Sequence, residues 1–336
     1  MTRHFALCAA ILLLMVSRPV SAEKLPAEPA KPEAPKVDEV KPIKEPIKLE
    51  WKWKKGDKLE VKFTDKRQMT RSADEALISK EQTVYTLAHE VTDVDATGVA
   101  TVTLKYEQIT YYRLDAKGET NWDSSNQPPP DKIKPNAKIG LYLCYLNQIL
   151  TLKVAASGEV KSLTGMNAIM DRVKIALKGT PGEAATIKIL DKCIIDSVFK
   201  DQLCLIYGPL PGKAAKTGDT WKQNIEVNQP TSGVTKQDLS FTLSGVVKRE
   251  KDELVKVGLK IVQDFEAEEG GGYKDYDVAA VDKDMGGEIL FSQTKGRVHS
   301  AKRGGTFDFE LAEKKTGDKT VLTIDGWFIA DLAPRK

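Results

Sequence analysis

The sequence predicts an α+β protein that is mainly β, built from two antiparallel curved-sheet modules with a helix pair between them. Apolar and polar residues alternate over long stretches in both halves of the chain, as expected for half-buried strands. A Gly-Asp turn opens each half, and only the middle of the chain changes to a helical spacing. We therefore expect a first β module at residues 49–163, the helix pair at 164–206 and a second β module at 207–336, related by an internal duplication.

The first module begins with the turn at Gly56–Asp57, where Gly supplies a positive φ and Asp bonds neighbouring amides. The apolar phase slips between Tyr106 and Ile109, which predicts a bulge or a bend. Residues 115–138 are polar and contain three consecutive prolines, so we expect a surface loop there. The strands are expected at Leu49–Trp53, Leu59–Phe63, Val84–Val91, Val99–Tyr106 and Leu150–Val154, with a returning strand from Val160 after the turn at Ser157–Gly158.

The helix pair is predicted from apolar residues at helical spacing between Met166 and Leu177, and again between Glu183 and Tyr207. Glycine and proline at 179–182 end the first helix, and Gly208–Pro209 ends the second. No other helix is expected after the N-terminal segment. Core packing is the expected role of these apolar stripes, and a helical lid over a hydrophobic ligand is the alternative.

The second module begins with a similar turn at Gly218–Asp219. Residues 266–287 are acidic and glycine-rich, which predicts a loop. A third Gly-Asp pair at 317–318 reads as a hairpin turn, so part of the repetition is ordinary turn chemistry. The strands are expected at Trp221–Val227, Leu239–Val247, Val255–Phe265, Glu288–Ser292, Phe307–Leu311 and Val321–Ala330.

The N-terminus carries the features of an export signal. Arg3 precedes an apolar run from Phe5 to Val16, and small residues up to Ala22 match a signal peptidase site. The run is shorter than the ~20 residues that span a bilayer, so residues 1–22 are interpreted as a signal peptide. The expected location is the periplasm or the extracellular space.

A linker follows the signal peptide. Residues 23–48 combine regularly spaced prolines with Lys, Glu and Ala, a composition that favours disordered, polyproline-like chain. Such a segment can act as a spacer from a membrane or wall, or as a motif for a cell-envelope partner.

The composition argues against several function classes. Lys and Arg number 51 against 48 Asp and Glu, whereas nucleic-acid binding needs clustered positive charge, so no nucleic-acid partner is expected. Beyond the signal peptide the only histidines are His89 and His299. His89 shares a face with Leu87 and Val91 and is expected to be a core or edge histidine with one partner, and His299 is expected to be solvated. We predict no catalytic residues, no metal site and no cofactor.

Two features of the sequence, an acidic stretch and the aromatic residues, could indicate a binding site. Asp282–Glu288 resembles a calcium loop, but the spacing of its ligands does not match, so a plain acidic loop is favoured. Aromatic residues on strands are expected to pack against the sheet. Trp122 is the exception, because it falls within the predicted polar loop and is the first candidate for a ligand-binding surface.

The cysteines leave two alternatives open. Cleavage of the signal peptide removes Cys8 and leaves Cys144, Cys193 and Cys204, an odd number for a disulfide framework. One disulfide with a free thiol is one interpretation, and three buried thiols are the other.

The order of these motifs resembles a family of exported bacterial β-rich proteins known only as a domain of unknown function. The resemblance spans most of residues 51–330 and implies a β-rich exported protein, but no activity and no site residues. The motifs that carry it are Trp53–Asp57, Val94–Ala100, Leu152–Val160, Pro209–Pro211, Lys216–Trp221, Gly287–Phe291 and Gly296–Val298.

The functional prediction is an exported, non-catalytic binding or cell-envelope-associated module. It is expected to hold a lipid or other hydrophobic ligand between curved sheets and the helix pair. The alternative is an exported hydrolase that acts on glycans through two carboxylates, which the sequence does not identify.

Overall fold

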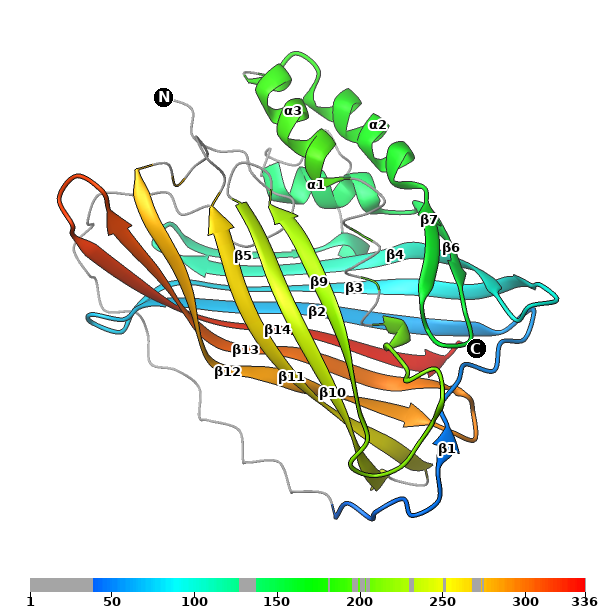
Figure 1. Ribbon diagram of the computed structural model, residues 1–336. Coiled ribbons are helices and arrows are strands. Elements are labelled where there is room, and N and C mark those ends of the chain that lie inside the picture. The colour runs from blue at the N-terminus through cyan, green and yellow to red at the C-terminus, as the bar shows by residue number, and fades with distance from the viewer. Residues whose placement is uncertain are drawn as a thin grey trace.

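The computed structural model describes residues 39–126, 137–180, 182–194, 206–229, 233–249, 252–267 and 275–335, together with residues 199, 203 and 273. Twelve strands form one antiparallel sheet, which is strongly curved and so has a concave and a convex face (Figure 1). The prediction of a mainly β protein with a few helices is therefore confirmed. The strands of the sheet are β2 (Lys58–Arg71), β3 (Ala76–Val94), β4 (Ala100–Asp115), β5 (Gly118–Asp123), β6 (Ile149–Val154), β7 (Val160–Thr164), β9 (Thr220–Gln229), β10 (Gly233–Arg249), β11 (Asp252–Ala267), β12 (Tyr276–Ser292), β13 (Arg297–Glu313) and β14 (Lys319–Pro334).

Both predicted β modules contribute to this one sheet. Its strand order is β7-β6-β4-β3-β2-β14-β13-β12-β11-β10-β9, and β5 pairs with β4. The halves meet where β14 pairs with β2, from Leu322 opposite Arg71 to Pro334 opposite Leu59. Each half is a meander of sequential neighbours, so its strands follow the order of the sequence.

The Gly-Asp turns of the two halves make the same hydrogen bonds. In the first, the Gly56 N–H donates to the Val91 carbonyl oxygen at 2.8 Å, and the Val91 N–H donates to the Asp57 carbonyl oxygen at 2.9 Å. The turn at Gly218–Asp219 repeats both bonds with Leu243 as its partner, at 2.9 and 3.0 Å. This equivalence is what an internal duplication predicts.

The third Gly-Asp pair is different. The Gly317 N–H donates to the Glu313 carbonyl oxygen at 2.8 Å. The Glu313 N–H donates to the Asp318 carbonyl oxygen at 2.9 Å. These bonds close the loop between β13 and β14, as predicted for a hairpin turn.

The predicted bulge in the first half is confirmed. Thr86 lies opposite Gln108, and Leu87 lies opposite Tyr106, so Glu107 is the extra residue in β4. The bulge restores the inward direction of Ile109, which explains the slip in the apolar pattern.

The helices differ from the prediction in two ways. Helix α1 (Ala137–Tyr145) was missed, because its short apolar run lies between a polar stretch and a strand. Helix α2 (Met166–Leu177) matches its prediction. Helix α3 (Glu183–Cys193) covers the first part of the second predicted helix and ends before Ile194, and the described residues Phe199, Leu203, Ile206 and Tyr207 are again helical. Met166, Ile169, Met170 and Val173 of α2 are buried, so its apolar stripe does pack against the core.

Three other predictions were wrong in part. Residues 118–123 of the predicted surface loop form β5, which pairs with β4, while residues 127–136 lie outside the described residues. Residues 276–287 of the predicted acidic loop belong to β12. The stretch from Leu49 to Trp53 is not a strand, although Leu49 and Trp51 are buried. The apolar residues alternate with polar ones in this segment because one side of it is buried, although its backbone is not a strand.

Residues 1–38 lie outside the described residues, and they include the predicted signal peptide and most of the predicted linker. The end of the predicted linker is held by the second half of the chain. Lys41 pairs with Val246, and β1 (Ile47–Lys48) pairs with β8 (Ala214–Ala215). No helix among the described residues is long and apolar enough to cross a membrane.

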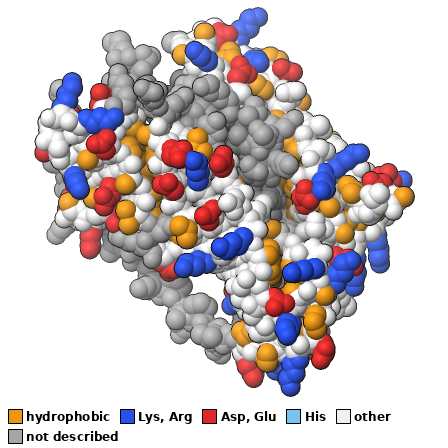
Figure 2. Space-filling model, viewed as in Figure 1, with side chains coloured by type: hydrophobic (Ala, Val, Ile, Leu, Met, Phe, Trp, Pro, Cys, Tyr) orange, Lys and Arg blue, Asp and Glu red, His pale blue; other side chains and the backbone are white. Residues whose placement is uncertain are grey.

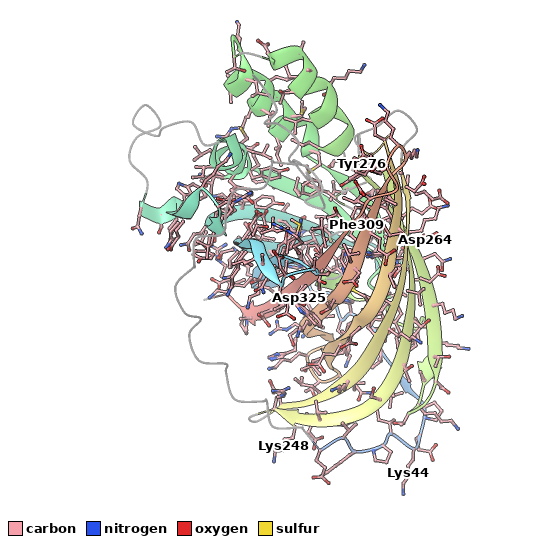
Figure 3. All side chains as sticks on the ribbon, turned by 90° about the vertical axis from the view of Figure 1, so that its left-hand side faces the viewer. Lys44, Lys248, Asp264, Tyr276, Phe309 and Asp325 are labelled. Carbon is pink, nitrogen blue, oxygen red and sulfur yellow. The ribbon has the colours of Figure 1, made fainter. Side chains whose placement is uncertain are left out.

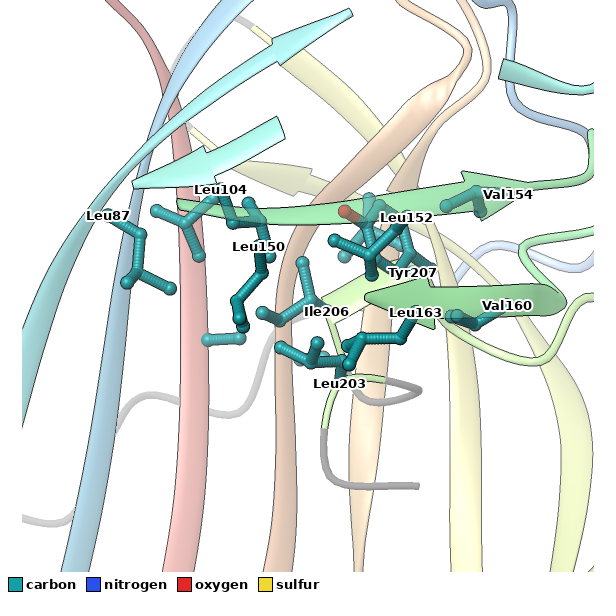
Figure 4. Packing of buried hydrophobic residues seen from close by; sticks show 14 of the residues in the cluster. Leu87, Leu104, Leu150, Leu152, Val154, Val160, Leu163, Leu203, Ile206 and Tyr207 are labelled. Atoms are coloured by element: carbon teal, nitrogen blue, oxygen red, sulfur yellow. The ribbon is translucent and has the colours of Figure 1, made fainter. Parts of the chain in front are cut away.

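One hydrophobic core fills much of the concave side of the sheet (Figure 4). It contains residues of both halves, such as Leu104 and Leu243, and the buried segment around Tyr207. A second cluster lies at the far end of the sheet, around Phe307, Phe309 and Ile324. The expected space between the sheet and the helices is thus occupied by side chains wherever the structure describes them.

Candidate functional site

The sheet divides between β11 and β12. These strands pair only from Val255 opposite Phe291 to Lys260 opposite Gly286. Beyond this point β11 stays paired with β10, and β12 stays paired with β13. Figure 3 labels Asp264 on the first arm and Tyr276 at the start of the second. We call this divergence of β11 and β12 the fork.

The arm that contains β11 folds over the concave face. The rings of Phe265 on β11 and Phe309 on β13 lie 5.3 Å apart, although β12 separates these strands in the sheet order. Tyr273 contacts both rings, at 6.0 and 5.6 Å. The second hydrophobic cluster is thus formed by the closing of the sheet on itself.

Glycines allow this sharp bend. Gly286 pairs with Gly304, and Gly305 pairs with Gly326, so a band of glycines crosses three neighbouring strands. Gly305 has a φ of 140°, and a Cβ at this position would overlap the Asp284 carbonyl oxygen. Glycine inside strands permits bends that side chains would prevent.

A hollow of about 510 Å³ lies at the fork. We call it the fork pocket, and its lining residues are Leu259, Lys260, Ile261, Val262, Asp284, Met285, Gly286 and Gly287. Val262 is 53% exposed, while Leu259 and Ile261 are buried on the inner side. The exposed side chains of Lys260 and Asp284 add charge at the outer side. The pocket therefore joins the outer surface to the interior.

A buried arginine lies beside the inner end of the fork pocket. Arg303 on β13 is directly opposite Gly287 in the β12–β13 ladder and is only 8% exposed. Its guanidinium carbon lies 5.4 Å from the ring centre of Phe328. Arg303 makes no hydrogen bond or ion pair with any residue that the structure describes.

A second arginine shares the same ring. The guanidinium carbon of Arg67 on β2 lies 5.7 Å from the centre of Phe328, and its Nη2 is 2.6 Å from Oδ2 of Asp65. The other carboxylate oxygen of Asp65, Oδ1, is buried and has no hydrogen-bond partner. Arg67 is thus paired with Asp65, whereas Arg303 has no ion-pair partner in the part of the chain that the structure describes.

Two more carboxylates lie on the same face of the sheet. Arg113 contacts Asp115 at 2.8 Å and Glu81 at 3.5 Å. Each of these acids, like Asp65, is therefore held by an arginine. A general acid of a glycosidase instead needs a carboxyl group whose surroundings keep it protonated, so this arrangement does not match that chemistry.

His89 lies in the core, in an aromatic cluster, but without the hydrogen-bond partner that was expected for it. The indole rings of Trp51 and Trp53 stack at 4.3 Å, and the ring of Tyr207 contacts both and His89. His89 is 1% exposed, neither of its ring nitrogens has a hydrogen-bond partner, and burial lowers its pKa to about 4. Because neither ring nitrogen has a hydrogen-bond partner, His89 has no arrangement suited to proton transfer. His299 is exposed, as predicted.

Trp122 is not an exposed platform. It lies on β5, is partly buried against the core, and stacks on Tyr142 with ring centres 6.3 Å apart. Asp282–Glu288, which resembled a calcium loop, lies within β12. Among the described residues no group of three potential ligands could hold a metal ion.

Cys144 is a buried free thiol, and burial raises its pKa. The side chains of Cys193 and Cys204 lie outside what the structure describes, so their state remains a prediction.

A second hollow, of about 460 Å³, lies on the other side of the sheet near β3 and β4. Its lining includes Lys58, Glu90, Glu107 and Arg335. Lys58 pairs with Glu90 at 3.6 Å, and Arg335 pairs with Glu107 at 2.8 Å. Because its charges satisfy one another, this surface is a weaker candidate than the fork pocket. The described parts of the face shown in Figure 2 mix charged and apolar side chains.

The comparisons with known proteins add a family but no activity. The model of a family of unknown function, DUF6263, matches residues 97–271. No curated protein matches the chain. Among solved structures, one of lipid–protein interactions in lipovitellin is 9% identical, with a TM-score of 0.39, over 85% of this chain and 26% of that chain. The chain thus spans about a quarter of that lipovitellin chain.

The other similar structures are more distant. The binding domain of botulinum neurotoxin DC in complex with rat synaptotagmin II is 7% identical, with a TM-score of 0.12, over 83% of this chain and 84% of that chain. TM-scores this low carry no information about function.

Proposed function

The chain belongs to this family of unknown function, and we propose that it is an exported, non-catalytic binding protein that holds a hydrophobic ligand in the fork pocket. The observation that carries the proposal is the pocket itself. Its volume of about 510 Å³ is within the usual range for small-molecule sites, and Leu259, Ile261, Val262 and Met285 give it apolar walls.

The location differs from the one that the sequence suggested. A ligand between the sheet and the helices would compete with the side chains of the main core, such as Met166 and Ile169, which are fully buried. A ligand in the fork would instead occupy space between two strands that have already separated. Val262, half exposed at the opening, would be covered by the bound ligand.

The non-catalytic part of the proposal rests on the chemistry of the inner face. Asp65, Glu81 and Asp115 are held by arginines, and His89 lies among aromatic rings. These arrangements offer no activated nucleophile or protonated acid. The glycan hydrolase is therefore the less supported alternative.

Export is supported by the sequence of residues 1–22 and by the proline-rich linker. The linker would separate the fold from a membrane or wall, or contact an envelope partner. N-terminal sequencing of the mature protein tests this part: the expected first residue is Glu23, and an intact Met1 would contradict export through a cleaved signal.

Native mass spectrometry of protein purified from its own envelope tests ligand binding. The wild type should carry an adduct with the mass of a lipid or similar amphiphile. Val262→Trp, which fills the pocket opening, should reduce the adduct. Val281→Trp is the matched control, since Val281 is 46% exposed on β12 but does not line the pocket.

Two results would count against the proposal. A wild type without any adduct would indicate that the fold carries no ligand in its own environment. An adduct that is equally abundant in both tryptophan variants would place the ligand elsewhere.

A further inference from the structure

We propose that the ligand of the fork pocket carries an anionic group, a carboxylate or a phosphate, and that Arg303 binds this group at the inner end of the pocket. The inference rests on the proposed function and adds the chemical class of the ligand. It starts from an arginine that is 8% exposed and makes no hydrogen bond or ion pair with any residue that the structure describes.

The guanidinium of Arg303 has donors available for a ligand. Arg303 is 8% exposed, and none of its nitrogens is fully enclosed without a hydrogen-bond partner, so its N–H groups face the little solvent that reaches them. Among the described residues its guanidinium lies over the face of Phe328, 5.4 Å from the ring centre. A charge with so little access to water gains from an anionic partner. A cation–π contact leaves the N–H groups at the guanidinium edge available as donors.

The charges nearby leave an excess of positive charge. Arg67 lies over the same ring and is paired with Asp65 at 2.6 Å. Arg67, Asp65 and Arg303 together carry a net charge of +1, and no carboxylate among the described residues pairs with Arg303. An anion with two oxygens fits the fork geometry of a guanidinium, and such bonds are stronger than neutral ones.

The register of the sheet connects Arg303 to the fork pocket. Leu259, Gly287 and Arg303 are neighbours across β11, β12 and β13, because Leu259 pairs with Gly287 and Gly287 pairs with Arg303. Directly opposite residues in a sheet point to the same face. Leu259 is part of the pocket wall. Because Gly287 lies between Leu259 and Arg303 and has no side chain, no side chain of β12 separates these two residues on this face.

Gly287 itself is constrained to be glycine. Its φ is 159°, and a Cβ there would overlap the Lys302 carbonyl oxygen. The opening toward Arg303 is thus a fixed feature of the bend. We place the anionic group of the ligand at Arg303 and its apolar chain along Leu259, Ile261 and Met285 toward Val262.

Asp65 provides the competing explanation. Its Oδ1 is buried without a donor, so one water molecule could bridge Asp65 and Arg303 and satisfy both. In that case Arg303 would need no anion from a ligand, and the pocket would show no preference for charge.

Calorimetric titration with matched probes distinguishes these cases. The probes are decanoate, decyl phosphate, decanol and inorganic phosphate, each titrated into the mature protein below its aggregation concentration. Wild type should bind the two anionic decyl compounds at least about tenfold more tightly than decanol, because charge-assisted hydrogen bonds to Arg303 form only with the anionic groups.

Variants then assign the preference to Arg303. Arg303→Gln should remove the preference without weakening decanol binding, and Arg303→Lys should keep part of it. Arg113→Gln is the control, because Arg113 already pairs with Asp115 and Glu81. Circular dichroism establishes which variants are folded, and the wild-type comparison of decanoate with decanol needs no variant.

Each outcome has a distinct meaning. Equal binding of decanoate and decanol would overturn the anion site and leave the proposed function intact. No binding of any decyl compound would overturn the proposed function itself. A third result would be that inorganic phosphate binds in an Arg303-dependent manner and that decyl phosphate binds no more tightly. This result would keep an anion site at Arg303 but overturn the proposal that its ligand is an amphiphile.

Discussion

The indole N–H of Trp51 donates a hydrogen bond to the carbonyl oxygen of Tyr207 at 2.7 Å, across 156 positions of sequence. Trp51 precedes β2, and Tyr207 is a helical residue between α3 and β8. The backbone N–H groups of Trp51 and Lys52 also donate to the turns at Ala156 and Gly296, one in each half of the sheet. The segment of Trp51 and Lys52 thus connects both halves of the protein to the chain that leaves the helices.

Replacing Trp51 with Phe should therefore destabilise the protein. Phe keeps the aromatic ring but leaves the Tyr207 carbonyl without this donor and creates a small cavity, which together cost about 1–3 kcal/mol. Urea denaturation measures the change. Trp327→Phe is the control, since Trp327 is only partly buried and its indole N–H bonds to Asp325 in an exposed position. Equal effects of the two substitutions would contradict this role of Trp51.

His89 should make stability depend on pH. Burial lowers its pKa to about 4 in the folded protein, against 6.5 in the unfolded chain. As pH falls from about 6.5 to about 4, the unfolded chain gains a proton that the folded protein does not, so the free energy of unfolding decreases. The decrease approaches about 3 kcal/mol near pH 4 and does not grow further, because His89 then protonates in both states.

Chemical denaturation of His89→Phe across this pH range tests the effect. The variant should lose this part of the pH dependence and keep the part due to carboxylates. His299→Gln, at an exposed histidine, should retain the wild-type profile. An unchanged profile in His89→Phe would show that the buried imidazole is not the group responsible.

Gly305 should tolerate no side chain. At a φ of 140°, Ala would be strained, and its Cβ would overlap the Asp284 carbonyl oxygen on the neighbouring strand. Gly305→Ala should cost more than about 3 kcal/mol or prevent folding. Gly317→Ala should cost about 1 kcal/mol, since its φ of 76° is unfavourable but no atom lies within 4 Å of the added Cβ. Thermal denaturation of both variants compares them, and similar losses would mean that the glycine band does not control the bend.

The sequence was most informative where one face of an element is buried. Val61, Val102 and Leu243 alternate with polar residues because one side of each strand meets the core, and α2 shows its stripe for the same reason. Even the bulge at Glu107 was visible as a phase slip. Pairing between distant strands was not visible, so the join of β14 with β2 came only from the structure.

The fork was missed for a physical reason. Gly286 and Gly287 resemble loop residues, and glycine weakens any strand prediction. Here they lie inside β12, at the bend where β11 and β12 separate. The signal that could have revealed it is the second glycine pair, Gly304–Gly305, within another alternating stretch. The partner of Gly287 in the ladder, Arg303, depends on register and was not identified from the sequence.

The most direct test of the account is photo-crosslinking with a decanoate analogue that carries a diazirine at the end of its chain. If the anionic group lies at Arg303 and the chain runs outward through the fork, peptide mapping should find the label on Val262 and Met285. Val262→Trp should reduce the label, and Val281→Trp should not. Label confined to α2 and α3, unchanged in Val262→Trp, would contradict the fork as the binding site and support a ligand beneath the helices.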